Sequence, residues 1–261
     1  MSGPRTRAGA ALAFERSGSG DPVVLLHGLG ADRGVWREAA PLLSRKRDVV
    51  AVDLLGFGAS PRPAGELSLL DLAAALRDLL DELSLYAVDL VGNSLGGWLA
   101  LHLAVTDPAR IRRVVAVAPA FLYGLPDSVT AADLAAAAAP RDFESMRAYL
   151  GRVLRAADAR TDEAVHAHLE RRIAARDERS IRALAESIVA GEGLLTDRLA
   201  NVAAPTLVVH GQHDGVVPLA QSERVSSEIG GATLRVLEES AHWPQLDETE
   251  AFVRAVEEFL S

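Results

Sequence analysis

Short apolar runs recur along the 261-residue chain, and they constrain its fold more than any other feature. Gly, Pro or Asp bounds each run, which is typical of strands that are buried on both faces of a sheet. The runs lie at residues 23–26, 49–52, 88–91, 114–117 and 206–209. Helical patterns separate them, for example over 69–83 and 95–105. This alternation predicts a mostly parallel sheet with helices on both faces.

The alternation stops between about residues 121 and 199, where helical patterns rich in Ala, Arg and Glu follow one another. It then resumes with strand and helix patterns at residues 206–209, from 219, at 233–237 and from 249. We therefore expect one core domain, made of residues 1–120 and 200–261, with a helical insertion over 121–199. Because the insertion follows one strand and precedes another, it can cover the strands' carboxyl ends, where open α/β sheets bind ligands. We expect it to act as a cap, or lid.

Composition excludes several kinds of partner and chemistry. The formal net charge of −9 argues against nucleic acid, which needs a concentrated positive surface. The absence of cysteine removes disulfides and thiolate chemistry. No apolar stretch approaches the length of a membrane span, and the N-terminus lacks the apolar segment of a secretory signal. We expect a cytoplasmic protein with a small-molecule substrate, and the sequence leaves the oligomeric state open.

The strongest local signal is the segment Gly-Asn-Ser-Leu-Gly-Gly at residues 92–97, between a predicted strand and a predicted helix. It matches G-x-S-x-G, in which a serine sits on a sharp, strained turn and the glycines leave room for neighbouring segments. A chance Gly/Ser turn is the alternative, but the strand and helix around it favour Ser94 as a nucleophile. The N–H of Leu95, at the start of the helix, can donate to an oxyanion. A second donor is the N–H of Leu29, in the loop after the first apolar run.

Position selects His242 as the base among the seven histidines. It lies in the loop after the last predicted strand, from where its imidazole can reach Ser94 over the edge of the sheet. His102 lies two helical turns beyond Ser94, and the other candidates lie in the insertion, beside the acid or in the first loop. We expect His27, in that first loop, to have a structural role.

Asp214 is the candidate acid that orients the base. It follows the strand pattern at 206–209, and the chain order Ser, Asp, His is the one found with G-x-S-x-G. Asp53 also follows a strand pattern, but it precedes the nucleophile. We expect Asp53 to brace a loop.

These segments together resemble the α/β-hydrolase family over nearly the whole chain. The segments that carry the resemblance are residues 27–28, 53–60, 92–97, 214 and 242–243. The resemblance implies an eight-stranded core with a helical cap, no metal and no organic cofactor. It also implies catalysis through an acyl-enzyme that water then cleaves.

Two subgroups of that family look similar to this chain. Small bacterial esterases and monoacylglycerol-lipase-like enzymes share the serine turn and a cap that begins much like residues 140–146. Hydrolases of ring-fission diketones often have Asn before the serine and Trp after the histidine, as Asn93 and Trp243 are here. That second subgroup usually carries an Arg-Trp pair in its cap, and an ungapped alignment puts His168 and Leu169 at those positions. Asn93, His168 and Trp243 are therefore the candidates for the substrate pocket.

We expect a carboxylic-ester hydrolase that acts on small to medium, largely apolar substrates, because cap residues are mostly Ala and Leu and no cationic pocket is evident. One alternative is carbon–carbon bond hydrolysis of ring-fission diketones, with Arg171 or Arg172 replacing the missing arginine. Another is a ligand receptor that retains the fold. Turnover of a simple chromogenic ester distinguishes an enzyme from a receptor.

Overall fold

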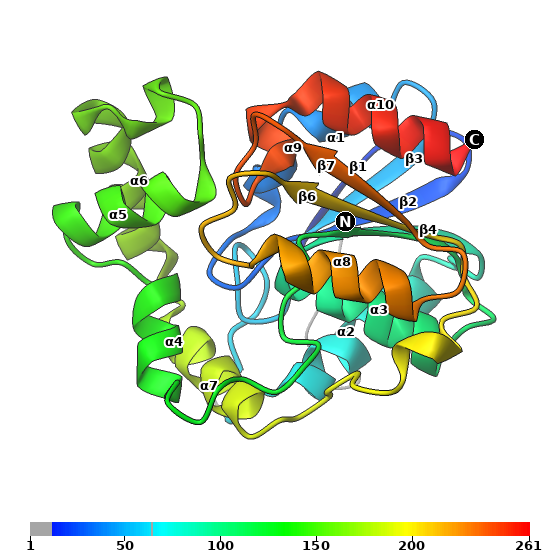
Figure 1. The fold of residues 1–261 in the computed structure, drawn as a ribbon, viewed down its shortest axis with the longest axis horizontal. Helices are drawn as coiled ribbons and strands as arrows, with labels where there is room; N and C mark the ends of the chain where they lie inside the picture. Colours follow the sequence, from blue (N-terminus) through cyan, green and yellow to red (C-terminus); the bar gives the residue numbers. More distant parts are fainter. Residues whose placement is uncertain (1–11, 64) are drawn as a thin grey trace.

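The computed structural model describes residues 12–63 and 65–261, and it is built around one twisted sheet (Figure 1). The strands are β1 Phe14–Gly18, β2 Pro22–Leu26, β3 Asp48–Val52, β4 Val88–Asn93, β5 Ile111–Val117, β6 Thr206–Gly211 and β7 Thr233–Leu237. Their order in the sheet is β1-β3-β2-β4-β5-β6-β7. β1 pairs antiparallel with β3, and every other pairing is parallel.

The predicted mostly parallel sheet is confirmed, but the described residues form seven strands rather than eight. The chain pattern did not predict β1, because four of its five residues are exposed and it lies at the edge of the sheet.

Helices cover both faces of the sheet. On one face lie α1 Ala39–Leu43 and α10 Thr249–Leu260, and on the other lie α2 Leu69–Glu82, α3 Leu95–Thr106 and α8 Leu219–Glu228 (Figure 1). Alternate residues of β2 point to opposite faces of the sheet. Val24 and Leu26 pack with α2 and α3 on one face, and Val23 and Leu25 pack with α1 and α10 on the other. Because both of its faces are buried, β2 reads as an unbroken apolar run.

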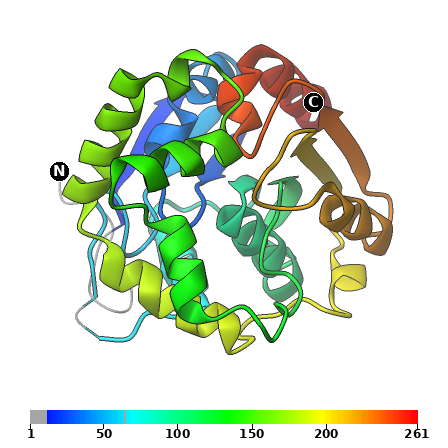
Figure 2. The same ribbon diagram turned by 60° about the vertical axis from the view of Figure 1, so that its left-hand side comes forward.

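Four helices follow one another between β5 and β6, within the stretch predicted as a helical insertion (Figure 2). They are α4 Ala131–Ala138, α5 Phe143–Val153, α6 Asp162–Ala175 and α7 Glu178–Val189. Capping boxes begin two of them, at Thr130 for α4 and at Asp142 for α5, and each satisfies backbone N–H groups at a helix start. We refer to residues 121–199 as the cap.

The remaining helical elements are short. They are η1 Arg33–Trp36, η2 Asp158–Arg160, η3 Leu199–Asn201 and α9 Pro244–Asp247. Within residues 12–63 and 65–261, no helix is both long and apolar enough to cross a bilayer.

Candidate active site

Ser94 occupies a strained turn between β4 and α3. Its backbone has φ 56° and ψ −114°, outside the conformations that L-residues ordinarily adopt. A Cβ on Gly92 would lie 2.0 Å from the carbonyl oxygen of Gly96, and one on Gly96 would lie 2.3 Å from that of Leu26. Both positions therefore require glycine, as G-x-S-x-G predicts.

His242 and Asp214 form a hydrogen bond at the carboxyl edge of the sheet. The distance between His242 Nδ1 and Asp214 Oδ2 is 2.7 Å, and both side chains are almost fully buried. The other oxygen of Asp214 accepts hydrogen bonds from the N–H groups of Val216 at 2.7 Å and Val217 at 2.9 Å. Because an ionised carboxylate only accepts, Nδ1 is the donor and Nε2 of His242 is left to take up a proton.

The electrostatics keep Asp214 ionised. Burial acts to raise its pKa, but the charge and hydrogen bond of His242 and the N–H groups of Val217 and Val216 outweigh it. The pKa of Asp214 is therefore below its usual value. His210 lies 3.6 Å from the same carboxylate, and burial lowers its pKa. His210 is already bonded to Ser222 and to the carbonyl oxygen of Val217, so it has a structural role.

Ser94 and His242 line the same cavity, which has a volume of about 80 Å³. Core residues Gly28, Leu29, Ala31, Val216 and Trp243 and cap residues Phe121, Leu134, Ala137, Ala138, Tyr149, Arg152 and Val153 complete its walls. A neighbouring cavity of about 170 Å³ shares several of these walls, among them Tyr149 and Trp243. We call the cavity lined by Ser94 the inner cavity and this neighbour the outer cavity. Catalytic hydrogen bonds often tighten only when substrate binds, and the described residues show no direct bond between Ser94 and His242.

The two predicted oxyanion donors lie beside Ser94. A Cβ on Gly28 would lie 3.1 Å from Cβ of Ser94 and 3.6 Å from its Oγ, so the first loop runs directly against the serine. Leu29 follows in that loop and lines the cavity. Leu95 begins α3, where backbone N–H groups have no partner within the helix.

The structure separates the three predicted pocket residues. Trp243 lines both cavities and His168 lines the outer one, where burial lowers the pKa of His168 to about 4. Asn93, in contrast, does not line either of these two cavities. It ends β4 and is fully buried, and its Nδ2 donates to the carbonyl oxygens of His242 at 3.0 Å and Val117 at 3.3 Å.

Cationic residues near Ser94 overturn the expectation that the pocket holds none. Arg152 of α5 lines the inner cavity, and Arg171 and Arg172 of α6 line the outer one. Arg172 bonds the carbonyl oxygen of Gly30 and pairs with Asp177. The sequence missed Arg152 and its neighbour Tyr149. Their helical spacing, with Val153 on the same face of α5, is the signal that could have found them.

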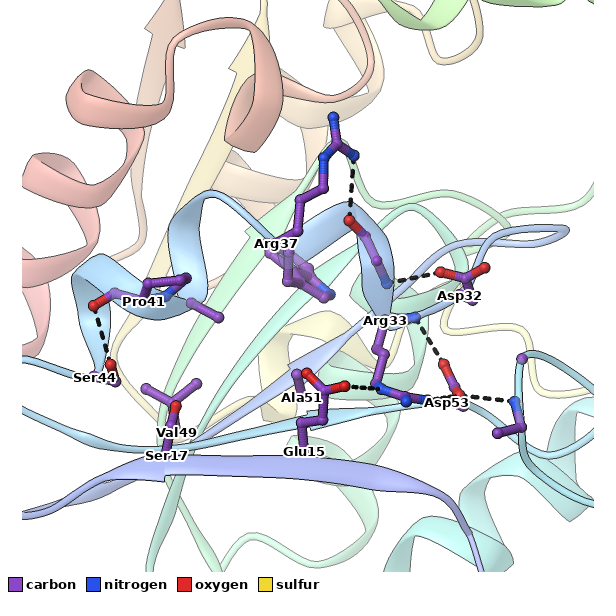
Figure 3. A pocket seen from close by; sticks show the side chains of 15 residues that line it. Glu15, Ser17, Asp32, Arg33, Arg37, Pro41, Ser44, Val49, Ala51 and Asp53 are labelled. Atoms are coloured by element: carbon purple, nitrogen blue, oxygen red, sulfur yellow. Dashed lines mark hydrogen bonds and ion pairs between the residues drawn. The ribbon is translucent and has the colours of Figure 1, made fainter. Parts of the chain in front are cut away.

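Two residues that could compete for the catalytic roles are bonded elsewhere. His27 is fully buried, with Nδ1 2.8 Å from the carbonyl oxygen of Gly28 and Nε2 accepting from the N–H of Leu54 at 2.9 Å. Asp53 lies in a different cavity, of about 800 Å³, where it pairs with Arg33 (Figure 3). It also accepts from the N–H groups of Arg33 and Ala59, each at 2.8 Å. Both residues hold loops in place.

Comparison with known proteins places these features in a family. The model of the alpha/beta hydrolase fold matches residues 21–249. A 2-hydroxy-6-oxo-2,4-heptadienoate hydrolase of Pseudomonas putida is 34% identical over 94% of this chain and 90% of its own length.

Solved structures agree with this match. A meta-cleavage product hydrolase from Pseudomonas fluorescens superposes with a TM-score of 0.87 at 29% identity, over 100% of this chain and 97% of the other. An esterase from Thermogutta terrifontis superposes with a TM-score of 0.83 at 25% identity, over 98% of this chain and 96% of the other. The chain belongs to the α/β-hydrolase fold family and is a hydrolase.

Proposed function

We propose that this hydrolase cleaves carboxylic esters with Ser94 as nucleophile, His242 as general base and Asp214 as the acid that orients the base. The observation that carries the proposal is the 2.7 Å hydrogen bond between His242 and Asp214, with Ser94 and His242 in the walls of one cavity. A serine activated by an adjacent base is the usual nucleophile of acyl transfer.

The reaction follows from this geometry in two halves. Oγ of Ser94 attacks the ester carbonyl carbon while its proton passes to Nε2 of His242, and the N–H groups of Leu29 and Leu95 stabilise the oxyanion. The ester C–O bond then breaks, and the departing alcohol takes the proton from His242. Water, deprotonated by His242, then attacks the acyl carbon. The bond from this carbon to Oγ breaks, and His242 returns the proton to Oγ, which releases the carboxylic acid and restores Ser94.

The walls of the inner cavity favour a small, largely apolar acyl group. Its side chains are mostly aliphatic or aromatic, and 80 Å³ is well below the roughly 300–1,000 Å³ of pockets that enclose drug-sized ligands. Because α4 and α5 supply much of the wall, the cap would act as a lid that excludes water.

Carbon–carbon bond hydrolysis is the second candidate, and the relative that cleaves a 2-hydroxy-6-oxo-dienoate favours it. A dienoate diketone needs a fixed cation for its carboxylate. His168 stands where similar diketone hydrolases carry arginine, and its pKa of about 4 leaves it neutral near pH 7. Arg172 is already bonded to Gly30 and Asp177. These two observations favour the ester, whereas Arg152, in the wall of the Ser94 cavity, is the cation that favours the diketone.

Steady-state kinetics on matched substrates test the choice. We expect kcat/KM for 4-nitrophenyl butyrate to exceed that for a ring-fission diketone at least about a hundredfold, a gap of roughly 2.7 kcal/mol. Ser94→Ala should abolish turnover of both substrates. His168→Ala should change the kcat/KM for each substrate, and the ratio of the two values, by no more than a few-fold. If the diketone is the better substrate, the ester proposal is wrong.

A further inference from the structure

The carboxyl end of α5 contacts the two loops that carry the proposed acid and base. The residues that follow Asp214 and His242 each donate a backbone hydrogen bond to this end of the helix. The bonds run from Gly215 to Arg152 and from Trp243 to Val153, both at 3.1 Å. The cap therefore docks on the core directly beside the catalytic residues.

One carboxylate, that of Asp247, joins the same two parts of the molecule. Asp247 ends α9, and its Oδ2 accepts a hydrogen bond at 2.9 Å from the N–H of Ala241, the residue before His242. Its Oδ1 accepts from the N–H groups of Arg155 at 2.9 Å and Ala156 at 3.1 Å, just beyond α5. The N–H of Arg155 also lies 3.1 Å from Oδ2. The two oxygens thus bind segments far apart in sequence.

The full set of bonds depends on both oxygens of a carboxylate. Asparagine has a single acceptor oxygen, so in place of Asp247 it would keep at most the bonds of Oδ2 to Ala241 and Arg155 and would lose the shorter bond to Arg155 and the bond to Ala156. Hydrogen bonds to an ionised acceptor are also about twice as strong as neutral ones. Asp247 is therefore suited to linking the two segments rather than to binding either one alone.

We propose that Asp247 is a positioning residue that couples the docking of the cap to the position of the His242 imidazole. It acts through the backbone of Ala241 and His242 and contacts no reacting atom. The coupling matters because a misplacement of about 1 Å can cost about a hundredfold in rate. The inference rests on the catalytic role proposed for His242.

Two other carboxylates provide comparisons because each bonds only within the base loop or only within the cap. Glu248 accepts from the N–H of Glu239 at 2.9 Å and from the hydroxyl of Ser240 at 2.6 Å, both within the base loop. Asp142 begins α5 and accepts from the N–H of Ser145 at 2.9 Å, within the cap. Asp142→Ala is the matched control, because it removes a cap hydrogen bond without touching the base loop.

The test combines the rate at which a small organophosphonate labels Ser94 with the proton NMR resonance of the His242 Nδ1–H. We expect Asp247→Ala and Asp247→Asn to slow labelling at least about tenfold and to shift or broaden the resonance. Asp247→Glu, which keeps two oxygens, should recover most of the rate. Asp142→Ala should label within about twofold of the unchanged chain, even if its Tm falls.

Two outcomes are distinguishable. If Asp247→Asn folds, labels as fast as Asp142→Ala and keeps the His242 resonance unchanged, the carboxylate serves stability alone and the inference is wrong. If the unchanged chain is not labelled at all, the proposed function fails instead. The resonance then still shows whether Asp247 positions the imidazole.

Discussion

The side-chain Nδ2 of Asn93 donates a hydrogen bond to the carbonyl oxygen of His242 at 3.0 Å. Asn93 immediately precedes Ser94, and the two residues are almost fully buried. The bond therefore links the segment of the proposed nucleophile to the segment of its base, across 149 residues of chain.

Replacing Asn93 tests this link. Asn93→Ala leaves the carbonyl oxygen of His242 without this donor, whereas that of Val117 keeps the N–H of Ser94, so we expect the free energy of unfolding to fall by about 1–3 kcal/mol. Ester turnover should fall about tenfold or more, because the base loop loses its anchor beside Ser94. Urea unfolding and steady-state kinetics measure the two effects. Asn201→Ala, at an exposed asparagine, is the control, and an equal effect of both variants would contradict the link.

An organophosphonate should label the chain once, on Ser94, because only a serine activated by a base attacks such reagents quickly. Intact-mass measurement gives the number of adducts, and peptide mapping gives the position. Ser94→Ala should abolish labelling. An adduct on Ser60 or Ser240, both of which are also buried, would mean that the G-x-S-x-G assignment is wrong.

Asp214 and Asp53 should respond differently to substitution by asparagine. Asp214→Asn should lower turnover about 10⁴-fold, because an amide favours the wrong tautomer of His242. Asp53→Asn should mainly lower the free energy of unfolding, because Asp53 pairs with Arg33 and accepts from Ala59. Kinetics and urea unfolding of both variants separate the roles. Near-normal turnover of Asp214→Asn would move the acid elsewhere.

His102 should make the fold less stable in mild acid. It is buried and stacked on Trp98, and burial, with smaller effects of Arg77 and Arg198, lowers its pKa to about 4. The unfolded chain binds this proton from about pH 6.5 downward, whereas the folded chain does so only near pH 4. Its contribution to stability is therefore present above pH 6.5 and lost as the pH falls toward 4.

A stacked, non-titrating ring removes this pH dependence. The free energy of unfolding of His102→Phe should fall less between pH 7 and pH 4.5 than that of the unchanged chain, by roughly 2 kcal/mol. Urea unfolding at the two pH values measures the difference. His213→Gln, at an exposed histidine, should leave the pH dependence nearly unchanged. Parallel curves for His102→Phe and the unchanged chain would refute the assignment.

The sequence alone determined six of the seven strands and the order of elements, because burial on both faces leaves short apolar runs in the central strands. The pattern at 233–237 matches β7 residue for residue, and the other predicted strands lie within observed ones. It also determined the turn at Ser94, since glycine is required at Gly92 and Gly96 by local crowding. β1 was not predicted, because a mostly exposed edge strand has no run of apolar residues.

Only the tertiary structure decided which side chains surround Ser94 and what holds the loops of the proposed acid and base. Asn93 looked like a pocket residue and is instead bonded to His242, while Arg152 brings a cation to the cavity wall. Asp247 bonds Arg155 across 92 residues of chain. Such bonds depend on where distant segments meet after the whole chain has packed. The periodicity of apolar residues in the sequence indicates how each segment is buried, but it does not indicate which distant segment will contact it.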